Sequence, residues 1–331
     1  MKCTNRKRSA AVLSLLTAMA VSFSGCGSLS YDMAYSANSD TSSFNVVYGQ
    51  DMGTVVPFAS DLCVVTGDVS EGTDADLSKA TAAVLFSISD NGVIYSKNAH
   101  ETLNPASLTK VMTALVALKY GSLNQVLTAS SAVNITESGA QLCGLKVGDT
   151  MTMDQALRIL LLYSANDVAM MIAEGVGGSV DRFVEMMNEE AKLLGATNTH
   201  FANPHGLTDA NHYTTAYDLY LIFNQAIKYE TFSEIIQMTG YQTVYYDKDG
   251  KEKQFDKSTT NLFLRADYSY TAPPNVTVIG GKTGTTSAAG HCLMLLARDV
   301  GGSPYIAVVM GVPSTDELYT GMTDLLEEIQ N

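Results

Sequence analysis

Ser107 and Lys110 are the first two residues whose types and spacing could do chemistry together. They lie three residues apart, directly after Pro105, a residue that is common in the first turn of a helix. On one helical face, the lysine amine can reach the serine hydroxyl. Serine needs a base to become a nucleophile, and lysine is such a base only when its pKa falls from about 10.4 toward 7 to 8. The spacing therefore predicts a serine nucleophile beside a buried lysine.

Two further segments carry polar groups that such a site needs. Ser164 and Asn166 interrupt two apolar helical stretches, so we expect their side chains to face a cleft. Lys282 follows a β-rich run and precedes Gly284, where a missing side chain lets a substrate backbone approach the strand closely. Lys282 could also be the second cation that lowers the pKa of Lys110.

The elements that must position these residues come from both ends of the chain. Strand patterns at 83–89 and 93–96 flank Asn91-Gly92, which suits a type I′ hairpin. Helical periodicity then dominates residues 105–238. We therefore predict a mixed α/β fold, in which an antiparallel sheet of N- and C-terminal strands is flanked by helices and interrupted by a large all-helical insertion. The later elements are strands at 241–246, 276–281, 292–297 and 305–309 and a closing helix over 315–329.

The composition excludes several classes of protein. With 46% hydrophobic and 16% charged residues, the 331-residue chain is globular rather than disordered or collagen-like. Its formal net charge of -14 has the wrong sign for a nucleic-acid binder. None of the five His residues has the spacing of a metal site, so we expect no metal and no cofactor. Beyond residue 26, Cys63, Cys143 and Cys292 allow at most one disulfide, whose pairing cannot be assigned.

Together the three segments resemble the penicillin-binding protein and serine β-lactamase superfamily. Its Ser-x-x-Lys, Ser-x-Asn and Lys-Thr-Gly motifs occur here in the expected order. The longer strings Pro-Ala-Ser-Leu-Thr-Lys at 105–110, Asn-Pro-His-Gly-Leu at 203–207 and Lys-Thr-Gly-Thr-Thr-Ser-Ala-Ala-Gly at 282–290 are similar to the low-molecular-mass D-alanyl-D-alanine carboxypeptidases. The resemblance covers about residues 80–331 and implies a β-lactamase/transpeptidase-like fold.

The resemblance also implies an activity, a serine-type D-Ala-D-Ala carboxypeptidase that removes the terminal D-Ala from peptidoglycan stem peptides. It implies Ser107 as the nucleophile that forms an acyl-enzyme and Lys110 as its base. Ser164, together with Lys282, would return a proton to the departing amine. β-Lactam antibiotics would acylate the same serine as covalent inhibitors. The implied substrate contacts come from Asn166, Lys282, Thr283, Gly284 and Thr285, and the implied oxyanion hole from the backbone N–H groups of Ser107 and Thr285.

Two other functions stay open. One is a β-lactamase, although no Glu between Ser164 and Lys282 has an Asn four residues later, as in the typical deacylating loop of class A enzymes. Residues 131–133, Ser-Ala-Val, could imitate the Ser-x-Val element of other β-lactamases. The other is a non-catalytic surface lipoprotein that binds penicillin or cell wall. His205 could be a base or a structural residue of its loop.

The first 25 residues have the pattern of a secretory signal peptide. A positively charged head precedes an apolar run over residues 10–23 that is too short to span a bilayer comfortably. Cleavage after Gly25 would leave Cys26 for lipid attachment, whereas cleavage after Ala20 would give a secreted protein. We expect an extracytoplasmic protein at the bacterial cell surface, with a lipid on Cys26 as its membrane anchor.

Residues 26–78 have the composition of an acidic linker. From residue 27 to residue 78 there are eight Asp or Glu and no Lys or Arg. Two apolar patches, at 46–48 and at 62–65, could still dock on the domain as a strand. The catalytic domain is expected over residues 79–331.

Overall fold

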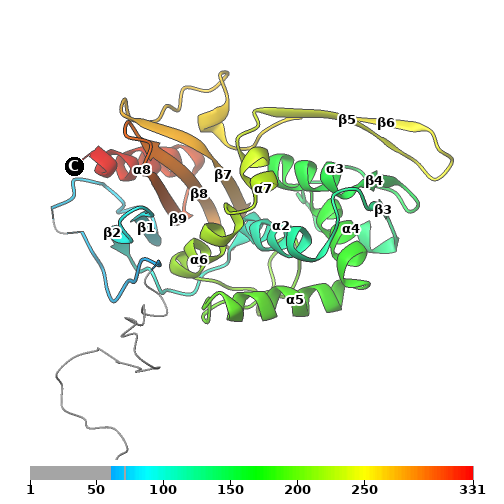
Figure 1. The fold of residues 1–331 in the computed structure, drawn as a ribbon, viewed down its shortest axis with the longest axis horizontal. Coiled ribbons are helices and arrows are strands. Elements are labelled where there is room, and N and C mark those ends of the chain that lie inside the picture. The colour runs from blue at the N-terminus through cyan, green and yellow to red at the C-terminus, as the bar shows by residue number, and fades with distance from the viewer. Residues whose placement is uncertain (1–60, 71, 331) are drawn as a thin grey trace, which may run out of the picture. The chain divides into compact units, whose positions relative to one another are not determined.

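The computed structural model describes residues 61–70 and 72–330 of the chain (Figure 1). Three predictions fall on other residues: the signal peptide over 1–25, lipid attachment at Cys26, and the linker as far as residue 60. They lie outside the described residues and stay predictions.

A five-stranded antiparallel sheet joins strands from both ends of the chain, as predicted. The strand order is β2-β1-β9-β8-β7, so the N-terminal strand β1 lies between β2 and the C-terminal strand β9. Every residue of β1 is buried, because both faces of the sheet are covered. The strands are β1 (Ala82–Ser87), β2 (Gly92–Lys97), β7 (Val276–Thr286), β8 (Gly290–Asp299) and β9 (Pro304–Val312).

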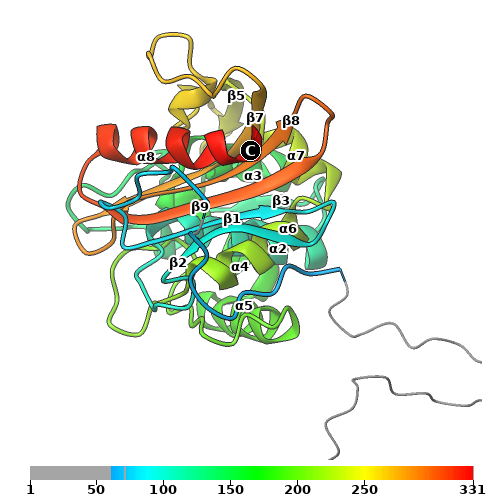
Figure 2. The ribbon, with the colours of Figure 1, turned by 90° about the vertical axis from the view of Figure 1, so that its left-hand side faces the viewer.

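Helices cover the two faces of this sheet (Figure 2). Helix α8 (Thr315–Glu327) packs on one face through Leu318, Met322 and Leu325, as expected for the closing helix. The other face carries the larger core, to which α2 (Thr109–Tyr120) and α6 (Ala216–Ala226) contribute. Side chains of β1 alternate between the two cores, which is the normal consequence of the period of two in a strand.

The insertion between the N- and C-terminal strands is mostly helical. Its α-helices all lie within the range 105–238, where periodicity predicted them, and a π-helical turn over Ile159–Tyr163 directly follows α3. The apolar composition of α2 follows from its burial, since every residue from Thr109 to Ala117 is buried. The remaining helices are α3 (Met153–Arg158), α4 (Asn166–Gly177), α5 (Val180–Leu193) and α7 (Glu230–Ile236).

A second, four-stranded sheet makes the insertion less uniform than predicted. Its order is β3-β4-β5-β6, and β5 and β6 form a long hairpin (Figure 1). The segments in β3 and β4 are only three residues long but rich in Thr and Val, which favour strands. The all-helical description therefore misses two short strands. The strands are β3 (Val126–Thr128), β4 (Thr150–Thr152), β5 (Gly240–Tyr246) and β6 (Glu252–Ser258).

The β1–β2 hairpin forms, but not through the predicted turn. A type I′ turn needs positive φ at both central residues, whereas here Asn91 has a φ of 53° and Gly92 is already in strand β2. Four residues, 88–91, connect the strands, and the Ser87 hydroxyl donates to the Asp90 carboxylate across the connection. This side-chain contact stabilises a longer loop than the dipeptide alone indicates.

Part of the predicted linker lies against the domain. The backbone N–H of Cys63 donates to the Tyr220 hydroxyl at 3.0 Å, and the Tyr217 hydroxyl donates to the Cys63 carbonyl at 2.9 Å. Further along, Val69 pairs with Ser96 of β2. The described part of the linker, residues 61–70 and 72–78, is therefore not a free tether. In its apolar patch at 62–65, Cys63 and Val65 are buried in the larger core whereas Val64 is exposed, and the packed chain begins before residue 79.

Candidate active site

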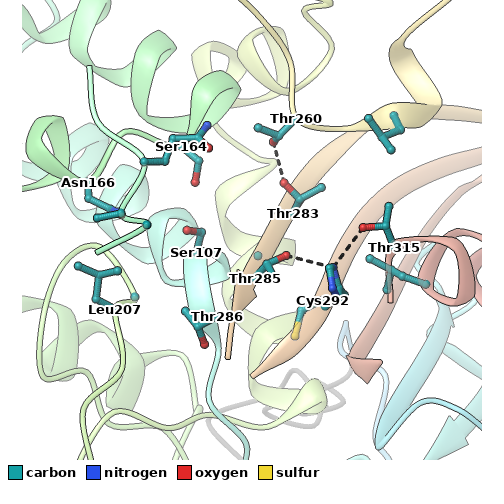
Figure 3. A pocket seen from close by; sticks show the side chains of 18 of the residues that line it. Ser107, Ser164, Asn166, Leu207, Thr260, Thr283, Thr285, Thr286, Cys292 and Thr315 are labelled. Atoms are coloured by element: carbon teal, nitrogen blue, oxygen red, sulfur yellow. Dashed lines mark hydrogen bonds between the residues drawn. The ribbon is translucent and has the colours of Figure 1, made fainter. Parts of the chain in front are cut away.

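The predicted nucleophile lies on a tight turn at the start of a buried helix. Ala106–Leu108 form a 3₁₀ turn that leads directly into α2, and Ala106 has a φ of 47°, a value that non-glycine residues rarely adopt. Ser107 is half-buried and lines a cavity (Figure 3). Lys110 is fully buried, and its Nζ lies 2.9 Å from the Ser107 Oγ. The structure thus brings together the pair that the sequence singled out.

The contacts of the Lys110 amine fit a neutral lysine. Nζ lies 2.6 Å from Asn166 Oδ1 and 2.5 Å from the carbonyl oxygen of His205, and these oxygens only accept hydrogen bonds. A neutral amine has two N–H bonds, which these two oxygens accept, and one lone pair. The lone pair is then left for the hydroxyl of Ser107, which can donate to it. The arrangement directs the base at the nucleophile.

Electrostatics also favours a neutral Lys110. Burial holds its pKa well below the ordinary lysine value, and the charge of Lys282 lowers it further, against the opposite effect of Asp167. Burial likewise lowers the pKa of Lys282, to about 7. The lowering of the Lys110 pKa by Lys282 agrees with the expectation from the sequence that Lys282 is a second cation near Lys110.

Ser164 itself has a left-handed backbone conformation, which directs its side chain. The π-helical turn Ile159–Tyr163 ends at Ser164, which has φ 71° and ψ 32°, and α4 begins two residues later at Asn166. The predicted interruption between two helices is therefore confirmed. The side chains of Ser164 and Asn166 both line the same cavity as Ser107. The Lys282 Nζ donates to the Ser164 Oγ at 3.0 Å and to the Thr283 carbonyl at 2.8 Å.

Strand β7 brings the third motif against the nucleophile. A Cβ at Gly284 would lie 2.9 Å from the backbone nitrogen of Ser107, a distance that real Cβ atoms do not show. Only glycine lets the strand lie this close to the 3₁₀ turn. β7 pairs with β8 on one side and is the last strand of its sheet, so its other edge remains available to an extended peptide.

These elements surround a cavity of about 400 Å³ (Figure 3). Six predicted residues line it, whereas the amines of Lys110 and Lys282 are buried behind the lining. The predicted lining residues are Ser107, Ser164, Asn166, Thr283, Gly284 and Thr285. Sequence reasoning missed lining residues that come from other loops, from β8 and from α8, namely Gln141, Leu207, Thr260, His291, Thr315 and Tyr319.

His205 acts through its backbone and its loop. Its carbonyl contacts Lys110, and its Nδ1 accepts a hydrogen bond from the backbone N–H of Leu207 at 3.1 Å. Burial and the nearby Lys110 lower the His205 pKa to about 3, so the imidazole is neutral near pH 7. These contacts favour the structural interpretation of His205 over a role as base.

A buried hydrogen-bond chain supports the turn that carries Ser107. The backbone N–H of Ala202 donates to His212 Nδ1 at 3.0 Å, which leaves Nε2–H to donate to the Thr109 hydroxyl at 2.8 Å. The Thr109 hydroxyl donates in turn to the Ala106 carbonyl at 2.7 Å. This series of hydrogen bonds ends at Ala106, the residue with positive φ directly before the nucleophile. Nothing in the sequence around His212 predicts this contact.

Asp167 anchors the loop that supplies Gln141. Its carboxylate accepts backbone hydrogen bonds from Cys143, Gly144 and Leu145, and the Gln141 carbonyl accepts from the Asn166 backbone at 2.8 Å. Because Asp167 follows Asn166, the N-terminal end of α4 carries Asn166 and also holds the loop that contains Gln141.

The described residues offer no other reactive centre of the common kinds. Cys63, Cys143 and Cys292 are all free thiols, and burial raises the Cys292 pKa to about 11. Within 61–70 and 72–330, no group of three or more His, Cys, Asp or Glu side chains could hold a metal ion. In the same ranges no helix is both long enough and apolar enough to cross a bilayer.

Comparison with known proteins decides the family. The peptidase S11 model, described as D-alanyl-D-alanine carboxypeptidase, matches residues 70–314. The chain belongs to this family. It is 34% identical over 252 residues to D-alanyl-D-alanine carboxypeptidase DacF of Bacillus subtilis, a match that covers 75% of this chain and 61% of the relative. The corresponding enzyme DacC of Escherichia coli is 32% identical over 248 residues, covering 72% of this chain and 58% of DacC.

Solved structures of the same fold agree. The Streptomyces K15 DD-transpeptidase matches with a TM-score of 0.69 and 28% identity, covering 78% of this chain and 98% of that one. A D-alanyl-D-alanine carboxypeptidase of Mycobacterium tuberculosis matches with a TM-score of 0.68 and 28% identity, covering 80% and 96%. The predicted family and mixed α/β fold are confirmed. The chain spans about three fifths of the length of the first curated relatives, 61% and 63%.

Proposed function

We propose that this protein is a serine-type D-Ala-D-Ala carboxypeptidase that removes the terminal D-Ala from peptidoglycan stem peptides. The observation that carries the proposal is the buried Lys110 amine, whose only partner able to donate a hydrogen bond, within residues 61–70 and 72–330, is the hydroxyl of Ser107. Family membership supplies the substrate class, because the matched relatives are named for this activity.

The proposed reaction begins with attack of the Ser107 oxygen on the carbonyl carbon of the penultimate D-Ala. Lys110 takes the hydroxyl proton, and the backbone N–H groups of Ser107 and Thr285 stabilise the developing oxyanion. Ser164, hydrogen-bonded to Lys282, returns a proton to the departing D-Ala amine. Water then attacks the ester that Ser107 has formed, which releases the shortened peptide and restores the hydroxyl.

The other predicted residues hold the substrate. Asn166 and Thr283 line the cavity on opposite sides of Ser107, on α4 and on β7 (Figure 3). We propose that Asn166 contacts the substrate amide and that Thr283 and Thr285 contact the terminal carboxylate. Contact of Lys282 with that carboxylate stays a prediction, because its amine donates to Ser164 and to a backbone carbonyl.

The purified protein is expected to release free D-Ala from a synthetic pentapeptide that ends in D-Ala-D-Ala. Chromatographic detection of free D-Ala over time measures this activity, and the same peptide ending in L-Ala-L-Ala is the control. Covalent labelling by penicillin without any D-Ala release would instead indicate the non-catalytic binding protein. Rapid penicillin hydrolysis without D-Ala release would indicate a β-lactamase.

We also propose that the protein works outside the cytoplasm. The support is in the sequence, where residues 1–25 have the pattern of a signal peptide and Cys26 follows two small residues. A diacylglyceryl group on Cys26 would hold the enzyme at the membrane surface next to its polymeric substrate. Metabolic labelling with a fatty-acid analogue, lost in a Cys26→Ser variant, would test this anchor.

A further inference from the structure

The cavity must hold an anion if the substrate ends in a free carboxylate, yet its lining is nearly devoid of charge. None of the nineteen lining residues is Lys, Arg, Asp or Glu. Lys282 has its amine buried behind the lining and engaged by Ser164 and a carbonyl. Among the lining residues, His291 alone has a side chain that can carry a positive charge near neutral pH.

His291 lies beside the strand that carries the third motif. It is on β8, directly opposite Thr285 of β7 in the register of the sheet. Its Nδ1 lies 3.4 Å from the Thr285 hydroxyl and 3.3 Å from the Thr315 hydroxyl. Its Nε2 has no hydrogen-bond partner within the described ranges 61–70 and 72–330 and is available to a ligand.

The two acidic residues that follow Thr315 in the sequence have other hydrogen-bond partners than His291. Asp316 and Glu317 begin α8 directly after Thr315, but neither lines the cavity. The Asp316 carboxylate accepts a hydrogen bond from the Tyr270 hydroxyl, and the Glu317 carboxylate accepts one from Ser314 at 2.8 Å. The imidazole is therefore surrounded by hydroxyl groups rather than by carboxylates.

We propose that His291 is a specificity-determining residue that contacts the C-terminal carboxylate of the substrate, together with the hydroxyl of Thr285. The inference rests on the proposed carboxypeptidase function. The free Nε2 of the imidazole can donate a charge-assisted hydrogen bond to an oxygen of the carboxylate. The enzyme thereby selects peptides that end in a free carboxylate and disfavours peptides whose C-terminus is blocked.

The test compares two acetylated tripeptides, L-Lys-D-Ala-D-Ala and the same peptide with a C-terminal amide. His291→Gln is expected to raise KM for the carboxylate peptide about tenfold and to leave kcat within about twofold. The reason is that the neutral side chain of glutamine cannot replace the charge-assisted contact of histidine with the substrate carboxylate. Cleavage of the amide peptide is expected to change less than about twofold. His200→Gln is the control, since His200 is exposed and does not line the cavity.

A second variant guards against misfolding of the first. Thr315→Val keeps the imidazole but removes one hydroxyl that holds it, and a smaller rise of KM is expected for the carboxylate peptide only. An unchanged preference for carboxylate over amide in both folded variants would overturn the assignment of His291. Failure of the wild-type protein to cleave either peptide would overturn the proposed function, and the inference with it.

Discussion

Replacing Lys110 by arginine is expected to slow acylation of the protein by penicillin about 10³-fold, the loss that removal of a general base typically causes. Guanidinium does not lose its proton in proteins, so it has no lone pair for the Ser107 hydroxyl. The longer side chain also meets the fixed oxygens of Asn166 and His205, which now hold the amine at 2.6 and 2.5 Å. Stopped-flow or quenched measurement of covalent labelling gives the rate.

Lys119→Arg is the matched control for this variant. Lys119 is on the same helix, but its side chain is 35% exposed and pairs with the carboxylate of Glu190, which is buried. Labelling by this control is expected to stay within about twofold of the wild type, since arginine keeps the positive charge beside Glu190 and position 119 does not line the cavity. If Lys110→Arg folds and still acylates within tenfold of the wild type, Lys110 is not the base.

Gly206→Ala is expected to lower the rate of acylation at least about 100-fold, because a misplacement of the reacting groups by about 1 Å costs this much. A Cβ on Gly206 would lie 1.8 Å from the carbonyl oxygen of Ala106. That carbonyl also receives the hydrogen bond from Thr109, so it cannot move without moving the turn that carries Ser107. The substitution therefore displaces the nucleophile.

Gly195→Ala separates this steric effect from backbone strain. Gly195 has a φ of +80°, close to the +88° of Gly206, but the nearest atom to an added Cβ there is a Leu221 methyl carbon at 3.9 Å. Gly195→Ala is expected to cost about 1–2 kcal/mol of stability from positive φ, and Gly206→Ala more than that because of the added steric contact, both measured by thermal unfolding. Equal acylation rates in the two variants would show that contact between Gly206 and Ala106 does not position the nucleophile.

The central sheet and the motif residues were predictable because each leaves a local pattern. β1, β8 and β9 are buried apolar runs bounded by polar turns, and α2 is apolar with Ser107 at its start. β6 was missed because six of its seven residues are charged or polar and only Phe255 is buried. A strand that is stabilised by pairing with β5, rather than by a buried face, gives little sign in its own residues.

The rest of the cavity could not be predicted, because its residues are neighbours only in the folded chain. His291 and Thr315 come from β8 and α8, and Gln141 from a loop that Asp167 holds by backbone hydrogen bonds. Gln141 and Thr315 lie far in sequence from the motif residues, and only the pairing of β7 with β8 brings His291 opposite Thr285. The same reason applies to His212, whose contact with Thr109 spans 103 residues.

The most direct test of the central claim is to locate the covalent ester. The protein is incubated briefly with penicillin, denatured in acid, and digested for peptide mapping by mass spectrometry, with Ser107→Ala treated in parallel. The account predicts a single added penicilloyl mass on the peptide that contains Ser107 and none in the variant. An adduct on any other residue, or D-Ala release that survives in Ser107→Ala, would contradict it.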